Sequence, residues 1–342
     1  MASPPCGCDG VIAYILRRLG MAALVVLVAL SVNFAIPRLM PGDPVEQQLA
    51  AASAAGGQSG DMAETARVMR AKLGLDRTLW VQYFAFLGNS ARLDLGVSVA
   101  SYPQPVAEIV LAGLPWTVGL LGTATAISFV LGTLLGALMA WPGTPRWLRL
   151  LALPVVVLSA IPYFILGLVL MALLGIVWPV LPVAGGYPFG MVLNADWTSL
   201  LAIGKHALLP GLSIVLASLG TWAVAMRGMV VGVLGEDYIM LAEAKGLPER
   251  RIFLAYGLRN ALLPQFTALA LRLGLLVSGA ILVEVIFAYP GIGYRLYVAI
   301  GQKDVFVVQG IVLLLSVSIA LAMLVLDLLY PLIDPRVASE GA

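Results

Sequence analysis

The stretch LPWTVGLLGTATAISFVLGTLLGALMA, from Leu114 to Ala140, decides the fold class, because its 27 residues include no charged side chain. A helix needs about 20 mostly apolar residues to cross a bilayer. The stretch is followed by Trp141-Pro142-Gly143, a combination typical of a helix stop. It therefore predicts one membrane-spanning helix with a defined end.

The composition of the whole chain leads to the same class. Of the 342 residues, 61% are hydrophobic and 11% are charged, and the mean hydropathy is +0.99. An average soluble domain carries about 25% charged residues. This excludes a water-soluble enzyme, and the 36 glycines suit close helix contacts in lipid. The net charge of +2 is too small to indicate a nucleic-acid partner.

Long apolar runs predict six spans and an all-helical integral membrane protein. The first could be a signal peptide, but no small-x-small cleavage site precedes Pro37, so we expect an uncleaved helix. The expected spans are Leu19 to Ile36, Leu114 to Ala140, Leu150 to about Val177, Ala207 to Ala225, Leu262 to Phe287 and Val305 to Leu326.

Lysines and arginines in the short connections predict the orientation. Ten lie in the connections on one side and three on the other, which places both termini in the cytoplasm by the positive-inside rule. The ten are Arg17, Arg18, Arg146, Arg149, Arg227, Lys245, Arg250, Arg251, Arg259 and Arg336; the three are Lys205, Arg295 and Lys303.

The common catalytic and metal-binding patterns are absent from the sequence. His206 is the only histidine, and the only cysteines, Cys6 and Cys8, precede the first apolar run. None of the four lysines ends a phosphate-binding Gly-rich loop, and the serines in the spans have no evident base. We therefore expect a pathway through the membrane, with no catalytic residues, metal or cofactor in this chain.

Two ionisable residues stand out in the fifth expected span. Arg272 lies about ten residues into it, near mid-membrane depth at about 1.5 Å per residue. Such residues are expensive in lipid and default to function. Arg272 could line the pathway or contact another subunit, or it could form a structural pair with Glu284 or a carbonyl. A direct pair is disfavoured, because the two lie about 120° apart around one helix.

The connection between the fourth and fifth spans contains an ordered pattern. Glu236-Asp237 begins a short helix that we expect to end at Gly246, and Pro248-Glu249 suit the first turn of a second helix, Arg250 to Leu262. The alternative is a solvated charged loop. Two short helices would instead present an ordered surface to a partner.

The segment EDYIMLAEAKGLPERRIFLAYGLRNALLP, from Glu236 to Pro264, resembles the EAA loop of ABC-importer permeases of the dipeptide/oligopeptide/nickel branch. Further segments resemble that family in the same order, so that the resemblance covers nearly the whole chain. They are RLMPGDP at 38–44, LGLDRTLWVQY at 73–83, DLGVS at 94–98, VEVIFAYPGIG at 283–293, VVQG at 307–310 and LLYPLIDPRV at 328–337.

This resemblance implies a type I importer permease with six transmembrane helices in the cytoplasmic membrane. Its partners would be a homologous second permease, two ATPases that bind ATP and magnesium, and an extracytoplasmic substrate-binding protein. The implied ATPase-coupling residues are Asp237, Ala242, Glu243, Ala244, Lys245, Gly246, Arg250 and Arg251. The implied parts are a cytoplasmic N-terminus (1–18), a first span (19–37), an extracytoplasmic cap (38–113), a permease core (114–332) with a coupling loop (227–261), and a cytoplasmic C-terminus (333–342).

Substrate identity follows less directly. Glu243 stands where the family often has arginine, Arg272 is unusual in the fifth span, and the first ten residues match nothing in the family. We order the expected substrates as small peptides, then oligosaccharides, then nickel. A membrane-embedded enzyme and an autonomous channel are the rival classes.

Overall fold

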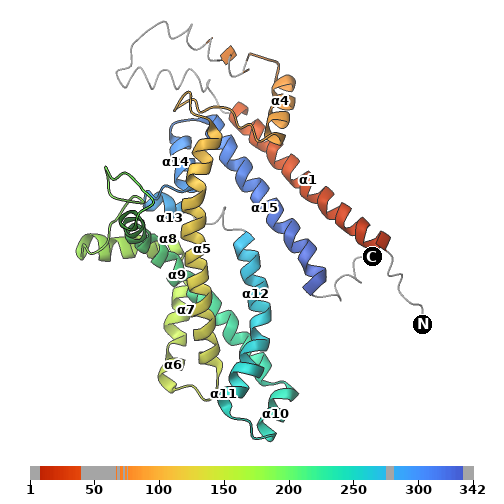
Figure 1. Cartoon of the computed structure of the whole chain (residues 1–342), viewed down its shortest axis with the longest axis vertical. Coiled ribbons are helices and arrows are strands. Elements are labelled where there is room, and N and C mark those ends of the chain that lie inside the picture. The colour runs from red at the N-terminus through yellow and green to blue at the C-terminus, as the bar shows by residue number, and fades with distance from the viewer. Residues whose placement is uncertain are drawn as a thin grey trace. The chain divides into compact units, whose positions relative to one another are not determined.

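The computed structural model of the chain (Figure 1) describes residues 8–39, 67, 70–71, 74, 76–274 and 281–333. Over these ranges it consists of helices joined by turns and loops. Four of the described helices can cross a membrane by length and composition: Tyr14–Leu39, Val106–Ala140, Trp197–Leu234 and Val305–Val325. The all-helical membrane class is thus confirmed. The chain divides into two compact units, residues 1–115 with 291–342, and residues 116–290.

The first unit is built around two long helices that pack side by side, α1 (Cys8–Leu39) and α15 (Val305–Ile333). Pro37 lies inside α1 and has no N–H to give to the carbonyl of Asn33, four residues earlier. The side chain of Gln309 donates to that carbonyl at 3.1 Å, and the Asn33 amide donates to the Gln309 carbonyl at 2.9 Å. Both side chains are buried. This reciprocal pair lets α1 continue past its proline.

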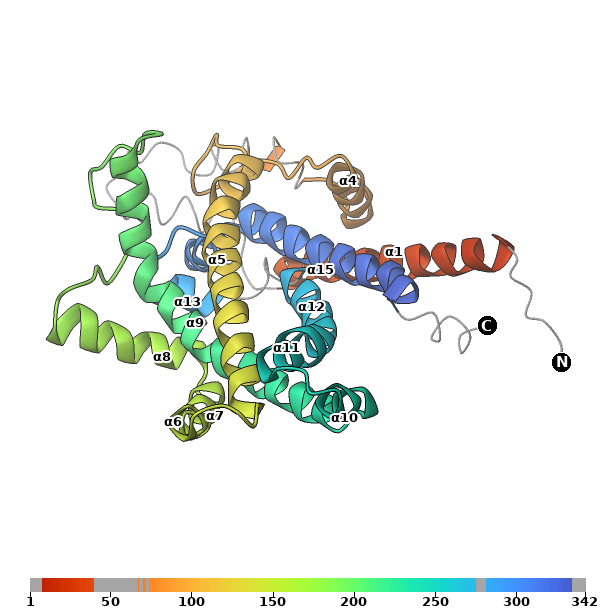
Figure 2. The ribbon, with the colours of Figure 1, turned by 60° about the horizontal axis from the view of Figure 1, so that its bottom comes forward.

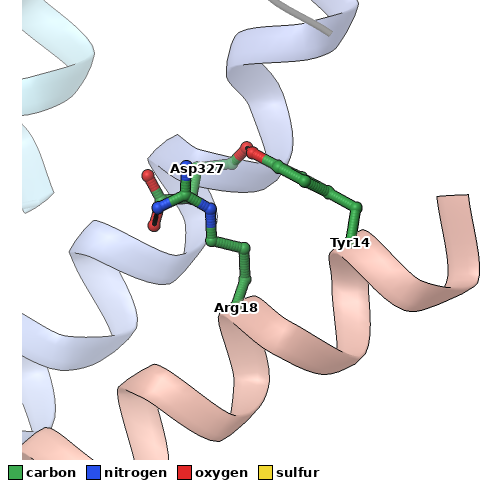
Figure 3. A network of polar contacts seen from close by, with 3 residues as sticks. All are labelled: Tyr14, Arg18 and Asp327. Atoms are coloured by element: carbon green, nitrogen blue, oxygen red, sulfur yellow. Dashed lines mark hydrogen bonds and ion pairs between the residues drawn. The ribbon is translucent and has the colours of Figure 1, made fainter. Parts of the chain in front are cut away.

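A second polar contact joins the other ends of these helices (Figure 3). Arg18 forms an ion pair with Asp327 at 3.0 Å, and the Tyr14 hydroxyl donates to the Asp327 carbonyl at 2.7 Å. Both charged side chains are about one-third exposed. Asp327 therefore serves the contact between helices.

The expected cap is described in part. The spacing of apolar residues from Leu79 to Leu87 predicts a helix there, which is confirmed as α4 (Leu79–Ala91). The sequence also predicts a helix from Thr65 to Leu73 that ends at Gly74. Of this region, residues 67, 70 and 71 are described and helical, and Gly74 has a φ of +68°. Residues 40–66 lie outside the described ranges.

Asp304 fixes the loop after α4 to the start of α15. One carboxylate oxygen accepts from the N–H of Val307 at 3.3 Å, as an N-cap does. The other oxygen accepts from the Ser98 hydroxyl and from the N–H of Ala100 at 3.0 Å. The carboxylate is buried and binds two segments that lie about 200 residues apart in sequence. Helix α14 (Ile292–Gly301) precedes it.

Helix α5 (Val106–Ala140) leads from the first unit into the second, where it packs against α9 (Trp197–Leu234). Its end at Ala140 is as predicted. A side chain at Gly132 would place its Cβ 2.6 Å from Trp222 Cβ, and one at Gly136 would collide with the backbone at Ala223. The expected role of glycine in close helix contacts is confirmed at these two positions.

The prediction of one continuous third helix is wrong. The run breaks at Ile161-Pro162 into α6 and α7 on one side and α8 and η1 on the other, and the two arms meet at 101° (Figure 2). Ile161 is extended, with ψ of 123°, because proline disfavours a helical conformation in the residue before it. The elements are α6 (Arg146–Leu150), α7 (Ala152–Ala160), α8 (Tyr163–Leu170) and η1 (Met171–Val177).

Helix α9 begins ten residues before the predicted start at Ala207. Asp196 caps it by accepting the N–H of Ser199 at 2.9 Å. The hydrogen bonds from Ser199 and Thr198 hold the pKa of Asp196 down at about 2. Lys205 and His206 therefore lie within the helix.

The expected fifth span, Leu262 to Phe287, falls on α12 (Arg259–Gly274) and α13 (Ile281–Ile286). Residues 275–280 between them lie outside the described ranges. The total of six spans therefore stays a prediction.

Candidate functional site

The connection after α9 forms the short helix α10 (Asp237–Ala244), as predicted. Gly246 ends it with a φ of +67°. The N–H of Gly246 donates to the Glu243 carbonyl at 2.8 Å, and the N–H of Leu247 donates to the Ala242 carbonyl at 3.3 Å. These two bonds define a Schellman motif, which satisfies carbonyls that a helix end leaves unpaired. The sequence Ala-Lys-Gly-Leu thus fixes where α10 stops.

One face of α10 is buried. Ile239 and Ala242 lie three residues apart, and both pack against Ile252, which follows the loop. Ala242, predicted among the ATPase-coupling residues, is 3% exposed, so its place is beneath the surface of the loop. The half-buried side chains around this cluster are Trp141, Val233, Tyr238, Leu247 and Tyr256.

The opposite face of α10 is open to solvent. The other seven predicted coupling residues are all exposed: Asp237, Glu243, Ala244, Lys245, Gly246, Arg250 and Arg251. Met240 and Leu241 also lie exposed, each at 56%, and were not among the residues predicted from the sequence. The sequence contains a clue to their exposure, because helical spacing places them on a different face of α10 from Ile239 and Ala242. The exposed surface of α10 is therefore apolar as well as charged.

The turn after α5 supports the loop, a contact that was not predicted from the sequence. The Trp141 ring lies 4.8 Å from the Phe253 ring, between centroids, at an angle of 64°. Trp141 also approaches Gly257 closely, and a Cβ at Gly143 would lie 2.8 Å from a carboxylate oxygen of Glu249. Both views place α10 and α11 (Glu249–Arg251) beside that end of α5 (Figures 1 and 2). The loop therefore rests on a transmembrane helix.

The second predicted helix differs from the structure in its start and its length. Pro248 precedes it as an N-cap with ψ of 139°, so only Glu249 belongs to its first turn. It continues through a π-helical segment into the fifth expected span, beyond the predicted end at Leu262. The successive elements are α11 (Glu249–Arg251), η2 (Ile252–Leu258) and α12.

The structure places Arg272 and Glu284 in different surroundings and does not pair them. Glu284 is 1% exposed and accepts a hydrogen bond from the Thr117 hydroxyl at 2.6 Å. Arg272 is exposed, and its guanidinium carbon lies 5.1 Å from the centroid of the Trp222 ring. Among the described residues, no group of three or more histidine, cysteine or acidic residues could hold a metal ion.

Several apolar spans and one ordered loop supported from a span define a multi-pass membrane protein with an ordered, exposed loop helix. Residues 132–339 match the family described as the binding-protein-dependent transport system inner membrane component, and the chain belongs to that family.

Named relatives match almost the full chain. The dipeptide transport system permease protein DppB of Escherichia coli is 32% identical over 96% of this chain and 99% of its own length. The oligopeptide transport system permease protein AppB of Bacillus subtilis is 30% identical over 95% and 99%. The glutathione transport system permease protein GsiC of Escherichia coli is 32% identical over 95% and 98%. These relatives are transport permeases, which agrees with the prediction that this chain is a transport subunit and no enzyme.

Proposed function

We propose that this chain is the permease subunit of an ATP-driven importer that carries di- and oligopeptides across the cytoplasmic membrane. The observation that carries the proposal is the match of at least 95% of the chain to relatives named for dipeptide, oligopeptide and glutathione transport. These relatives are named for peptides and for glutathione, itself a small peptide, so peptides stay first among the expected substrates.

The proposed assembly contains four kinds of subunit. This chain pairs with a homologous second permease, two ATPases bind ATP and magnesium on the cytoplasmic side, and an extracytoplasmic binding protein delivers the peptide. The family description, a binding-protein-dependent system, supports the last partner. Both termini and α10 lie in the cytoplasm in this proposal, and residues 38–113 lie outside.

The exposed face of α10 is the proposed ATPase-docking surface. Met240 and Leu241 supply apolar contact area, and Asp237, Glu243 and Lys245 supply charges around them. Apolar side chains at the centre with polar groups at the rim are typical of protein interfaces. Movement of the ATPases would reach the spans through the cluster of Ile239, Ala242 and Ile252 and through Trp141.

A pull-down of the complex in mild detergent tests this assignment. The variant Met240→Asp with Leu241→Asp should lose the ATPases and the uptake of a labelled dipeptide, while the second permease stays bound. Val192→Asp is the matched control, because Val192 is also an exposed apolar residue but lies in the loop expected on the outer side. ATPases that stay bound to the double variant would refute the docking surface.

Uptake in the same preparation tests the substrate. Unlabelled di- and tripeptides should compete with the labelled dipeptide, whereas nickel ions and oligosaccharides should not. If the wild-type chain purifies alone and conducts ions without ATP, the importer assignment fails and the channel class replaces it.

A further inference from the structure

Arg272 is the only charged residue between Asn260 and Val283. It lies 13 residues beyond Arg259, at the start of α12, which corresponds to about 20 Å along a helix axis. A charge at such a depth in a membrane is expensive and is retained where it has a partner.

Among the described residues, the guanidinium of Arg272 contacts an aromatic ring and forms no ion pair. It lies over Trp222, whose ring is buried and makes an edge-to-face contact with Phe129 at 5.1 Å. A cation–π contact of this kind orients the cation without using a hydrogen-bond acceptor on its N–H groups. Because Arg272 is exposed as well, its donors can reach a molecule outside α12.

Within the part of the chain that the structure describes, no anion neutralises the charge of Arg272. Among the described residues, no carboxylate forms an ion pair with Arg272. Residues 275–280, which lie outside the described ranges, contain no acidic residue either. A negative charge opposite Arg272 must therefore come from another molecule or from a part of the complex outside residues 116–290.

Further polar side chains lie near Arg272, where α12 contacts α9. Gln265 lies seven residues before Arg272, which puts both on one face of α12. Within the described part of the chain, neither amide atom of Gln265 has a hydrogen-bond partner, and the same holds for Trp222 Nε1 and Thr133 Oγ1. All three side chains are buried. Buried polar groups in proteins are normally paired, and most of all where lipid excludes water.

We propose that Arg272 binds the terminal carboxylate of the transported peptide as it crosses the membrane. A planar guanidinium matches a carboxylate with two parallel N–H donors. The amide of Gln265 and the hydroxyl of Thr133 can exchange hydrogen bonds with a peptide backbone once α9 and α12 separate. The inference rests on the proposed function and adds the part of the substrate that this chain recognises.

Thiol labelling beside Arg272 tests the proposal in the complete purified importer. The chain has only two cysteines, so Cys6→Ser and Cys8→Ser give a background in which Ala268→Cys is its sole thiol. Ala268 is half-buried and lies one turn before Arg272. The rates at which an anionic and a cationic methanethiosulfonate label the thiol are compared. Labelling is followed by the increase in the mass of this chain. Ala255→Cys, an exposed position in η2, is the control.

Dialanine and dialanine amide are then added directly at millimolar concentration, without the binding protein. We expect the anionic reagent to label residue 268 several-fold faster than the cationic one. Dialanine should slow that reaction and dialanine amide should not. Arg272→Gln should remove both effects, and Arg272→Lys should keep the preference for the anion. Labelling at residue 255 should change in none of these cases.

Equal slowing by dialanine and its amide would overturn the carboxylate assignment. A thiol at 268 that fails to react while 255 reacts would also overturn it, because the second permease would then cover Arg272. Failure of the proposed function is distinct from both outcomes, since no second permease or ATPase would then copurify with the chain.

Discussion

At the scale of single residues, Gly246 is the position where backbone conformation matters most to the proposed docking surface. Its φ of +67° costs other residues about 1–2 kcal/mol, whereas a Cβ there would meet no atom within 4 Å. Gly246→Val should therefore loosen the end of α10 and lower peptide uptake several-fold, while Gly246→Asn should keep most of it, since asparagine tolerates this conformation. Gly232→Ala, a helical glycine with equal space, is the control. Uptake by Gly246→Val at the wild-type level would contradict the argument.

A second residue-scale prediction concerns the carbonyl of Asn33, which Pro37 leaves without its helical donor. Gln309→Leu removes the side chain that replaces that donor and should lower the free energy of unfolding by about 1 kcal/mol. Pro37→Ala restores a backbone N–H, so the same Gln309 substitution should cost less in that background. Thermal unfolding of the four proteins in detergent measures this double-mutant cycle. Equal losses in both backgrounds would show that Gln309 does not compensate for the proline.

At the scale of elements, the features predictable from sequence were local ones. The stop at Ala140, α4 and the end of α10 each depend on a few neighbouring residues such as Trp141-Pro142-Gly143 and Gly246. The break at Ile161-Pro162 had a local signal, but it lay inside a long charge-free run and was overridden by the apolar pattern. The support of α10 by Trp141 could not be predicted, because it joins segments about 100 residues apart. The burial of Ala242 in α10, while the other seven predicted coupling residues are exposed, likewise depends on contacts that only the fold creates.

Because Trp141 supports α10, substitution of Trp141 tests whether motion passes from α10 to the spans. Trp141→Ala should remove the contact with Phe253 and part of the cover of Ile239, so that α10 still docks but transmits motion poorly. We expect peptide uptake to fall several-fold in an assembled complex, with ATP hydrolysis no longer stimulated by the loaded binding protein. Trp141→Phe should retain much of both activities. Trp147→Ala is the matched control, since Trp147 is 63% exposed in α6. Normal stimulation in Trp141→Ala would exclude this route.

At the scale of the whole molecule, the proposed function requires one arrangement in the membrane. An even number of spans puts both termini on the side of α10, and it puts residues 178–195 on the other side. Single cysteines at Ala255 and Val192, in the background without Cys6 and Cys8, should therefore react with an impermeant thiol reagent from opposite faces of sealed vesicles. A protease-cleavable tag at the N-terminus should be cut from the same face as Ala255. The comparison of the tag with Ala255 also tests the bend of 101° at Pro162, because a re-entrant segment there would not cross the membrane. Because α9 alone separates Val192 from Ala255, a tag cut from the face opposite to Ala255 would remove the crossing at Pro162, and α10 and the termini could no longer share a side through six spans.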